Sequence, residues 1–397
     1  MSTRTPRDLT QGPIGRNLLL FALPILGGNI AQSLNGSVNA VWIGRHLGED
    51  ALTAAANANN IMFFLLGSMF GLGMAASILI AQAMGARDTD QARRTMGSSA
   101  TFFIGLSVLI AIGGWWLARH LLAWMGTPAP SLPLAEAYLR VIFLAMPALY
   151  AFAFLAAALR GAGDSRTPFR FLLVAVLLDI AFNPLLIFGI GPFPKLGIAG
   201  SAWATLLSQT LALGALLLHL RRKRHVLWLG RKDAALLLPQ PRIVQALVLK
   251  GVPMGLQMML ISLAMIAMMT MVNGFGTATA AGYGAALQLW TYVQMPAMAI
   301  GAACSSMAAQ NVGAGRWDRV DATAWTGVGF NFLLTGALIA PLILLDRWTL
   351  ALFLPAGSQS LEIARHLNHI AVWSFLFFGV TFVLSGVIRS TGAVIPP

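Results

Sequence analysis

One carboxylate, Asp179, lies near the middle of an apolar stretch, FLLVAVLLDIAFNPLLIFG at residues 171–189. A run of this length is enough to cross the hydrocarbon core of a bilayer as a helix. A charge at that depth costs ~2.5–3.5 kcal/mol on insertion scales, so a carboxyl kept there faces protein or water and marks an ion pathway. Of the 13 Asp and Glu residues, Asp179 is the one that we place deep in an apolar span. We therefore expect it to bind a coupling cation, H⁺ or Na⁺.

Two residues close to Asp179 in the sequence could shape such a site. Asn183 follows the acid by four residues, so both lie on one helix face, where the amide can hydrogen-bond the carboxyl. Pro184 lacks an amide proton and leaves a carbonyl oxygen free one turn earlier as a further ion ligand. The alternative is a structural role, in which a protonated acid forms a hydrogen bond between two helices.

A stripe of amides lies in an earlier apolar stretch. Gln32, Asn35 and Asn39 recur at i, i+3 and i+7, which places them on one face of a helix. In a membrane this face points into a helix bundle, and we expect it to lie toward Asp179. The amide oxygens could bind Na⁺, or the amides could form hydrogen bonds between helices without any ion.

The elements that position these residues are membrane-spanning helices. The chain is 57% hydrophobic and 10% charged, whereas a soluble domain is about 25% charged. Unpaired strand edges cannot face lipid, so an all-α integral membrane protein is expected. Apolar spans are predicted at residues 17–43, 53–84, 96–118, 135–159, 170–190, 198–220, 247–272, 280–311, 322–345 and 366–388.

The distribution of basic residues predicts that both termini are cytoplasmic. With the N-terminus inside, the inner segments contain most of the 26 Lys and Arg residues, from Arg4 and Arg7 to the RRKRH cluster at 221–225. Cytoplasmic loops carry such an excess, so the net charge of +13 reflects membrane topology rather than binding of nucleic acid. The outer segments contain Arg45, Arg119, Arg140, Lys195, Arg347 and Arg365.

The two halves of the sequence repeat in the same orientation. LPI at 23–25 matches VPM at 252–254, AQAMGARD at 81–88 matches AQNVGAGR at 309–316, and LRGAG at 159–163 matches IRSTG at 388–392. The matches are 228 or 229 residues apart, which is typical of a transporter built from two similar bundles. We predict a first bundle of six spans at 1–220, a basic linker at 221–246 and a second bundle at 247–397.

The repeat also predicts helices that the sequence does not contain. The fifth and sixth spans of the first bundle should recur near residues 399–419 and 427–449, beyond the last residue, Pro397. The second bundle therefore holds four of an expected six helices. A truncated transporter without activity is one alternative that follows from this pattern.

The quoted segments resemble the multidrug and toxic compound extrusion (MATE) transporters. The resemblance rests on FALPILGGNIAQSLNGSVNAVWIGRHLGEDALTAA, AQAMGARD, LRGAGDSRTPF, DIAFNPLLIFG, GIAGSAWAT and AAQNVGAGRWDR, which follow the family's order along the whole chain. It implies two six-helix bundles that form a V around a central cavity. It also implies export of organic cations driven by inward H⁺ or Na⁺.

The sequence departs from the family pattern at its acids. Where the first helix of the family has an aspartate, this chain has Asn39, and in the fifth helix the usual order of Asn and Asp is reversed to Asp179 and Asn183. We therefore expect the cation site in the first bundle, formed by Asp179, Asn183, Asn39, Asn35 and Thr205, the last placed by the resemblance. Candidate substrate-cavity residues are Gln32, Gln257, Gln288 and Met258, the last in a methionine-rich stretch suited to varied apolar ligands.

Other classes of function lack their residues. One cysteine, Cys304, excludes an internal disulfide and a cysteine metal cluster, and no histidine pair within a span has metal-ligand spacing. The sequence contains no phosphate-binding loop of the ATPase type. A membrane enzyme would need a pair of acids, or a histidine with a partner, within the spans, and the sequence has neither. We expect no cofactor beyond the coupling ion.

We predict a secondary antiporter that exports amphipathic organic cations or drugs in exchange for H⁺ or Na⁺. It should act as a monomer in the lipid bilayer of a bacterial-type inner membrane. The alternative is a lipid-linked sugar flippase of a related two-bundle superfamily. That function needs a strongly basic cavity, and no Arg or Lys lies deep within a predicted span.

Overall fold

The computed structural model describes residues 8–351, 353–355 and 357–393; Arg4 and Arg7 lie outside the described residues. Within them every regular element is a helix, which confirms the predicted all-α fold. The first half contains α1 (Ile14–Leu47), α2 (Glu49–Gly85), α3 (Thr89–Trp124), α4 (Leu132–Gly161), α5 (Arg166–Phe188) and α6 (Ile198–Lys223). The second half contains η1 (Arg231–Leu237), α7 (Pro241–Asn273), α8 (Thr277–Gly313), α9 (Trp317–Leu344), α10 (Asp346–Leu350), α11 (Gln359–Ala371) and α12 (Ser374–Ser390).

The first nine predicted spans each correspond to one long helix, and local signals fix several of their ends. The Asp88 side chain accepts a hydrogen bond from the Gln91 amide at 2.8 Å, so it caps the start of α3. Gly189 ends α5 in the left-handed region, with a φ of 72°, where a residue with a side chain would be strained. The apolar runs are therefore bounded by ordinary capping chemistry.

The tenth predicted span is broken, where the sequence predicted an uninterrupted helix. It corresponds to α11 and α12, which are bent by 48° relative to each other. Asn368 in α11 donates to the Leu342 carbonyl of α9 at 3.2 Å and accepts from the Trp290 indole of α8 at 3.1 Å. These bonds hold α11 against its neighbours at an angle to α12.

Eight helices in the described part are long and apolar enough to cross a bilayer, and the α11–α12 pair is a ninth candidate. The predicted span that does not meet this criterion is α8, although it has 37 residues. It packs against α1, α2, α9, α11 and α12, and most of its second half is buried. A helix surrounded by protein on most sides tolerates more polar and small residues than one that faces lipid.

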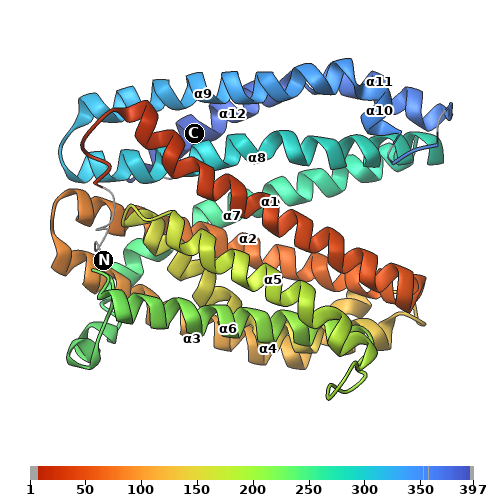
Figure 1. The fold of residues 1–397 in the computed structure, drawn as a ribbon, viewed down its shortest axis with the longest axis horizontal. Helices are drawn as coiled ribbons and strands as arrows, with labels where there is room; N and C mark the ends of the chain where they lie inside the picture. Colours follow the sequence, from red (N-terminus) through yellow and green to blue (C-terminus); the bar gives the residue numbers. More distant parts are fainter. Residues whose placement is uncertain (1–7, 352, 356, 394–397) are drawn as a thin grey trace.

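The helices form two bundles, with α1 and α7 crossing between them (Figure 1). In the first bundle α4 packs against α2, α3 and α6, and α5 packs against α6. In the second bundle α8 packs against α9, α11 and α12. The helix α1 contacts α8 and α9 of the second half as well as α5 of the first, and α7 contacts mainly α2. Each half therefore contributes its first helix to contacts with the other half.

Glycines allow α7 to approach α2 closely. A Cβ added at Gly71 in α2 would lie 2.3 Å from the Gly255 nitrogen and 2.4 Å from the Gly251 oxygen of α7. Small residues four apart let membrane helices pack backbone to backbone, and Gly251 and Gly255 have this spacing. Beyond this crossing the second half of α7 is exposed, with apolar side chains at Leu256, Leu260, Leu263, Ile266 and Met271.

The ends of α2, α4, α8 and α12 gather at one end of the molecule, at the left in Figure 1. We call this the basic end, because the residues there include Arg87, Arg160, Arg316 and Arg389. The turns that join α2 to α3, α4 to α5 and α8 to α9 all belong to it.

Candidate functional site

The carboxylate of Asp179 is buried in the first bundle at the contact of three helices. It projects from α5, and its residue is 2% exposed. Its hydrogen-bond partners come from α1 and α6, which pack against α5. An acid at this depth is stabilised only if its oxygen atoms are satisfied by nearby donors or by a cation.

The helix α1 supplies two amide donors to one oxygen of this carboxylate. The Nδ2 atoms of Asn35 and Asn39 both lie 2.9 Å from Asp179 Oδ2. These residues are four apart on α1, so the side-chain stripe predicted from the sequence does face the acid. Gln32, the third member of that stripe, is exposed and is not connected to Asp179 by any hydrogen bond between described residues.

The helix α6 supplies two hydroxyl groups to the other oxygen. Thr205 Oγ1 donates to Asp179 Oδ1 at 3.1 Å, and Ser208 Oγ lies 3.4 Å from the same atom. Thr205 was among the predicted site residues and Ser208 was not. The two lie at i and i+3 on α6, and this spacing is the signal that identifies Ser208 once Thr205 is placed.

Asn183 lies in the site, but it does not contact the carboxylate as the sequence suggested. Its Nδ2 atom donates to the backbone oxygen of Asp179 at 2.8 Å and to Asn39 Oδ1 at 3.0 Å. The Asn183 amide therefore bonds to the backbone of Asp179, one turn earlier on α5, and to the Asn39 side chain on α1. Asn39 therefore joins Asp179 and Asn183 through its nitrogen and its oxygen respectively.

Several oxygen atoms of this cluster are buried and have no hydrogen-bond partner among the described residues. They are Asn35 Oδ1, Asn183 Oδ1 and Ser201 Oγ, the last on α6 one turn before Thr205. Unpaired buried acceptors are costly. Together with the carboxylate they make an oxygen-rich donor set of one negative charge, which fits a hard monovalent cation or a proton with accompanying hydrogen bonds.

The remaining candidates for the substrate cavity form no hydrogen bond with Asp179 among the described residues. Gln257 in α7 accepts a hydrogen bond from the Arg389 guanidinium of α12. Met258 lies beside Gly67 of α2, at the crossing of α2 and α7. Gln288 in α8 is exposed. The structure therefore unites the predicted cation-site residues in one cluster. The predicted cavity residues lie on α1, α7 and α8 and share no hydrogen bond with that cluster among the described residues.

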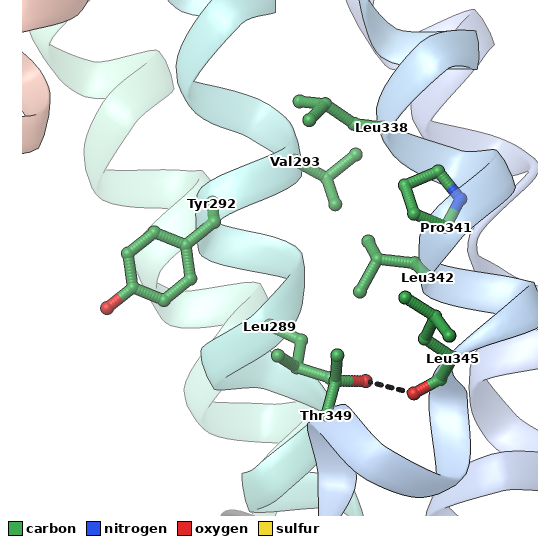
Figure 2. Close-up of a pocket in the computed structure, with 8 residues that line it drawn as sticks. All are labelled: Leu289, Tyr292, Val293, Leu338, Pro341, Leu342, Leu345 and Thr349. Carbon is green, nitrogen blue, oxygen red and sulfur yellow. Dashed lines mark hydrogen bonds between the residues drawn. The ribbon is translucent and has the colours of Figure 1, made fainter.

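An apolar pocket lies in the second bundle, between α8, α9 and α10 (Figure 2). Its volume is about 240 Å³, and it is lined by Leu289, Tyr292, Val293, Leu338, Pro341, Leu342, Leu345 and Thr349. The Thr349 hydroxyl is bonded to the Leu345 carbonyl at 3.1 Å, and the Tyr292 ring points away from the other side chains. This pocket offers no charged group and is separate from the Asp179 cluster.

Comparison with known proteins places the chain among membrane transporters. The MatE family model matches residues 24–185 and 253–397. The probable multidrug resistance protein YoeA of Bacillus subtilis (strain 168) is 36% identical over 384 residues, covering 97% of this chain and 83% of that protein. The probable multidrug resistance protein YpnP of the same organism is 34% identical over 393 residues, covering 98% and 85%.

A solved structure has the same arrangement of helices. It is the outward-facing conformation of a multidrug resistance MATE family transporter of the MOP superfamily, with a TM-score of 0.89 and 21% identity. The match covers 98% of this chain and 86% of that one. At this identity the likeness shows the two-bundle fold.

Proposed function

This chain belongs to the MatE family of multidrug efflux transporters, and on that premise we propose that it exports amphipathic organic cations in exchange for H⁺ or Na⁺. The observation that carries the proposal is the buried Asp179 carboxylate with four side-chain donors from α1 and α6. A lone acid at such depth is the expected feature of an ion pathway. Since the donors come from different helices, occupation of the site by an ion changes how those helices pack.

Coupling follows from a difference in ion affinity between two arrangements of the bundles. A ligand shifts a conformational equilibrium only as far as its affinity differs between the two states. The site of Asp179 is built from α1, α5 and α6, and α1 also contacts α8 and α9 of the second half. An ion that binds to the acid changes the hydrogen bonds that Asn35 and Asn39 donate to it, and therefore acts on a helix shared by both bundles.

The unpaired oxygen atoms support Na⁺ as the first ion to test. A proton needs one acceptor, whereas Na⁺ prefers several oxygen ligands. Asn35 Oδ1 and Asn183 Oδ1 are free for this purpose, and both amides are within one hydrogen bond of Asp179 or Asn39. Rotation of these amides would present their oxygens to a cation held by the carboxylate.

The exposed half of α7 supports an amphipathic substrate. Met265, Met268 and Met271 are all exposed, as are several leucines between them. Methionine is flexible and polarisable, and surfaces rich in it adapt to varied apolar ligands. We propose that Gln32, Gln257, Gln288 and Met258 line the substrate cavity. We place the basic end in the cytoplasm by the excess of Arg and Lys. We further propose that the chain acts as a monomer in the inner membrane.

The experiment is efflux of ethidium from proteoliposomes that contain the 397-residue chain, with Na⁺ and H⁺ gradients imposed separately. The parent chain should move ethidium with one of the two gradients and stop when that gradient is collapsed. Asp179→Asn removes the charge and keeps the shape, so gradient-driven efflux should fall at least tenfold. The matched control is Glu362→Gln, an exposed acid of α11 that pairs with Arg365.

Three results would decide the matter. Loss of efflux in Asp179→Asn but not in Glu362→Gln supports coupling through Asp179. Normal gradient-driven efflux by Asp179→Asn would overturn the assignment of the coupling site. Efflux that is indifferent to both gradients would overturn antiport with H⁺ or Na⁺.

A further inference from the structure

Two equivalent hydrogen bonds connect the two halves of the chain at the basic end. Gln82 of α2 donates its Nε2 proton to the Ser390 carbonyl, the last of α12, at 2.7 Å. Gln310 of α8 donates its Nε2 proton to the Gly161 carbonyl, the last of α4, at 2.9 Å. The first bond runs from the first half to the second, and the other runs in the opposite direction.

The four residues are equivalent in pairs under the sequence repeat. Gln82 and Gln310 are 228 residues apart, and Gly161 and Ser390 are 229 apart, which are the offsets of the repeated segments. The two bonds are therefore one contact repeated by the pseudo-symmetry of the fold. Each closes the C-terminal end of a helix in the opposite half, where backbone carbonyls lack partners and the helix dipole is negative.

The glutamines lie where the main chains of α2 and α8 touch. A Cβ added at Gly85 would lie 1.9 Å from the backbone oxygen of Gln310, and one added at Gly313 would lie 1.9 Å from the backbone oxygen of Gln82. Gly85 and Gly313 are again equivalent in the repeat. Such close reciprocal contacts are possible only with glycine on both sides, so this end is closed by backbone packing as well as by the two bonds.

Burial makes these bonds significant. Gln310 is 3% exposed and Ser390 is fully buried, whereas Gln82 is half-buried. The apolar residues next to the glutamines, Ala81 and Ala309, are fully buried together with Ile78. A buried carbonyl that loses its donor destabilises the fold, because it is neither hydrated nor hydrogen-bonded. Separating the bundles at this end breaks both bonds and brings water to Ala81 and Ala309.

The segment before α1 also contacts one side of this region. The Leu9 amide donates to Gln310 Oε1 at 3.1 Å, and the Asn311 side chain lies 3.4 Å from the Leu9 carbonyl. Leu9 is fully buried. Among the hydrogen bonds between described residues, none of this kind reaches Gln82 Oε1, so the two glutamines are not equally held.

We propose that Gln82 and Gln310 form a reciprocal interlock that holds the bundles together at the basic end and opens in each transport cycle. The strength of the two bonds then sets the balance between the arrangement closed at this end and the one open there. Both glutamines are positioning residues, since neither contacts the Asp179 cluster. The opening step rests on the proposed antiport, whereas the interlock itself can be measured without transport.

The test uses a single cysteine as a reporter of opening. In a Cys304→Ala chain, Ala81→Cys places a thiol at the buried contact, and its labelling rate by a permeant maleimide reports exposure of that contact. Gln82→Met and Gln310→Met keep the side-chain length and remove the donor. Gln82→Met should raise the labelling rate roughly fivefold, and Gln310→Met at least as much, because its bond is buried and its side chain also holds Leu9. The two together should raise it roughly twentyfold or more, as expected for independent hydrogen bonds. Gln245→Met, at an exposed position of α7 near the basic end, is the matched control and should change nothing.

A labelling rate that stays within twofold of the parent in the double variant, with unchanged thermal unfolding, would overturn the interlock. If Gln310→Met lowers the stability, Gln82→Met alone carries the test, because it leaves the contacts of Gln310 with Leu9 and Gly161 in place. Ethidium efflux from the same proteoliposomes separates the two proposals. Faster labelling without any efflux supports the interlock and counts against the antiport, and unchanged labelling with normal efflux does the reverse.

Discussion

Asn39 Nδ2 lies 2.9 Å from Asp179 Oδ2, so an amide of α1 donates directly to the buried acid of α5. The oxygen of the same amide accepts a hydrogen bond from Asn183 Nδ2 at 3.0 Å. One side chain of α1 is therefore bonded to two side chains that lie one turn apart on α5. Since α1 also packs against α8, the state of the acid is connected to the contact between the bundles.

The first prediction concerns a second acid at this point. Asn39→Asp would place two carboxyl groups in direct contact, and like charges at that distance do not both ionise at neutral pH. We expect the variant to hold a shared proton there, so that its efflux depends on the H⁺ gradient whatever ion drives the parent. Efflux measured against external pH tests this, with Asn29→Asp on the same helix as control. A pH profile identical to that of the parent would contradict the prediction.

The second prediction ranks the two hydroxyl donors of α6. Thr205 Oγ1 is 3.1 Å from Asp179 Oδ1 and Ser208 Oγ is 3.4 Å away, close to the limit for a hydrogen bond. Thr205→Val should raise the ion concentration for half-maximal efflux about tenfold, since bonds to charged groups contribute about 1.5–3 kcal/mol. Ser208→Ala should raise it less than threefold. The ranking fails if Ser208→Ala has the larger effect.

Much of the cluster around Asp179 could be predicted because each part has a local signature. The amides of Asn35 and Asn39 are four residues apart in an apolar helix, and such residues need a polar environment wherever the helix lies. The single acid in an apolar span identified where that environment should be. Ser208 has only its i+3 spacing from Thr205 as a signal, because a lone serine in a membrane helix commonly bonds to its own backbone, as Ser208 also does to the Thr205 carbonyl.

The docking of the halves could not be predicted in the same way. The repeat AQAMGARD and AQNVGAGR identified Gln82 and Gln310 as equivalent, but periodicity does not state which helix end lies opposite a given glutamine. The bend between α11 and α12 was missed for a related reason. It is accompanied by hydrogen bonds of Asn368 with α8 and α9, and these contacts exist only in the folded bundle.

The third prediction concerns the crossing of α2 and α7. Gly71→Ala would place a methyl group 2.3 Å from the Gly255 nitrogen and 2.4 Å from the Gly251 oxygen, both backbone atoms that cannot rotate away. We expect a loss of about 1–3 kcal/mol of stability, typical of overpacking. Gly113→Ala in α3 is the control, because an added methyl there meets nothing within 4 Å and should be neutral or stabilising. Thermal unfolding in detergent compares them, and equal midpoints would contradict the prediction.

The last prediction concerns pH and the buried acid of α10. Asp346 Oδ2 accepts bonds from Arg365 at 3.0 Å and His369 at 2.8 Å, both on α11. Burial by itself raises the pKa of the Asp346 carboxyl, but the bonds from His369 and Arg365 outweigh it and hold that pKa below its usual value. A lowered carboxyl pKa stabilises the fold at pH values above the ordinary carboxyl pKa of about 4, and this contribution is lost as pH falls through the folded-state pKa.

Asp346→Asn should therefore lower the unfolding midpoint at neutral pH, and its difference from the parent should shrink as the pH is lowered below about 4. Asp318→Asn, at an exposed acid of α9, should show no such difference at any pH. A constant gap between Asp346→Asn and the parent across the whole pH range would mean that the ionised carboxylate does not hold α11 in place.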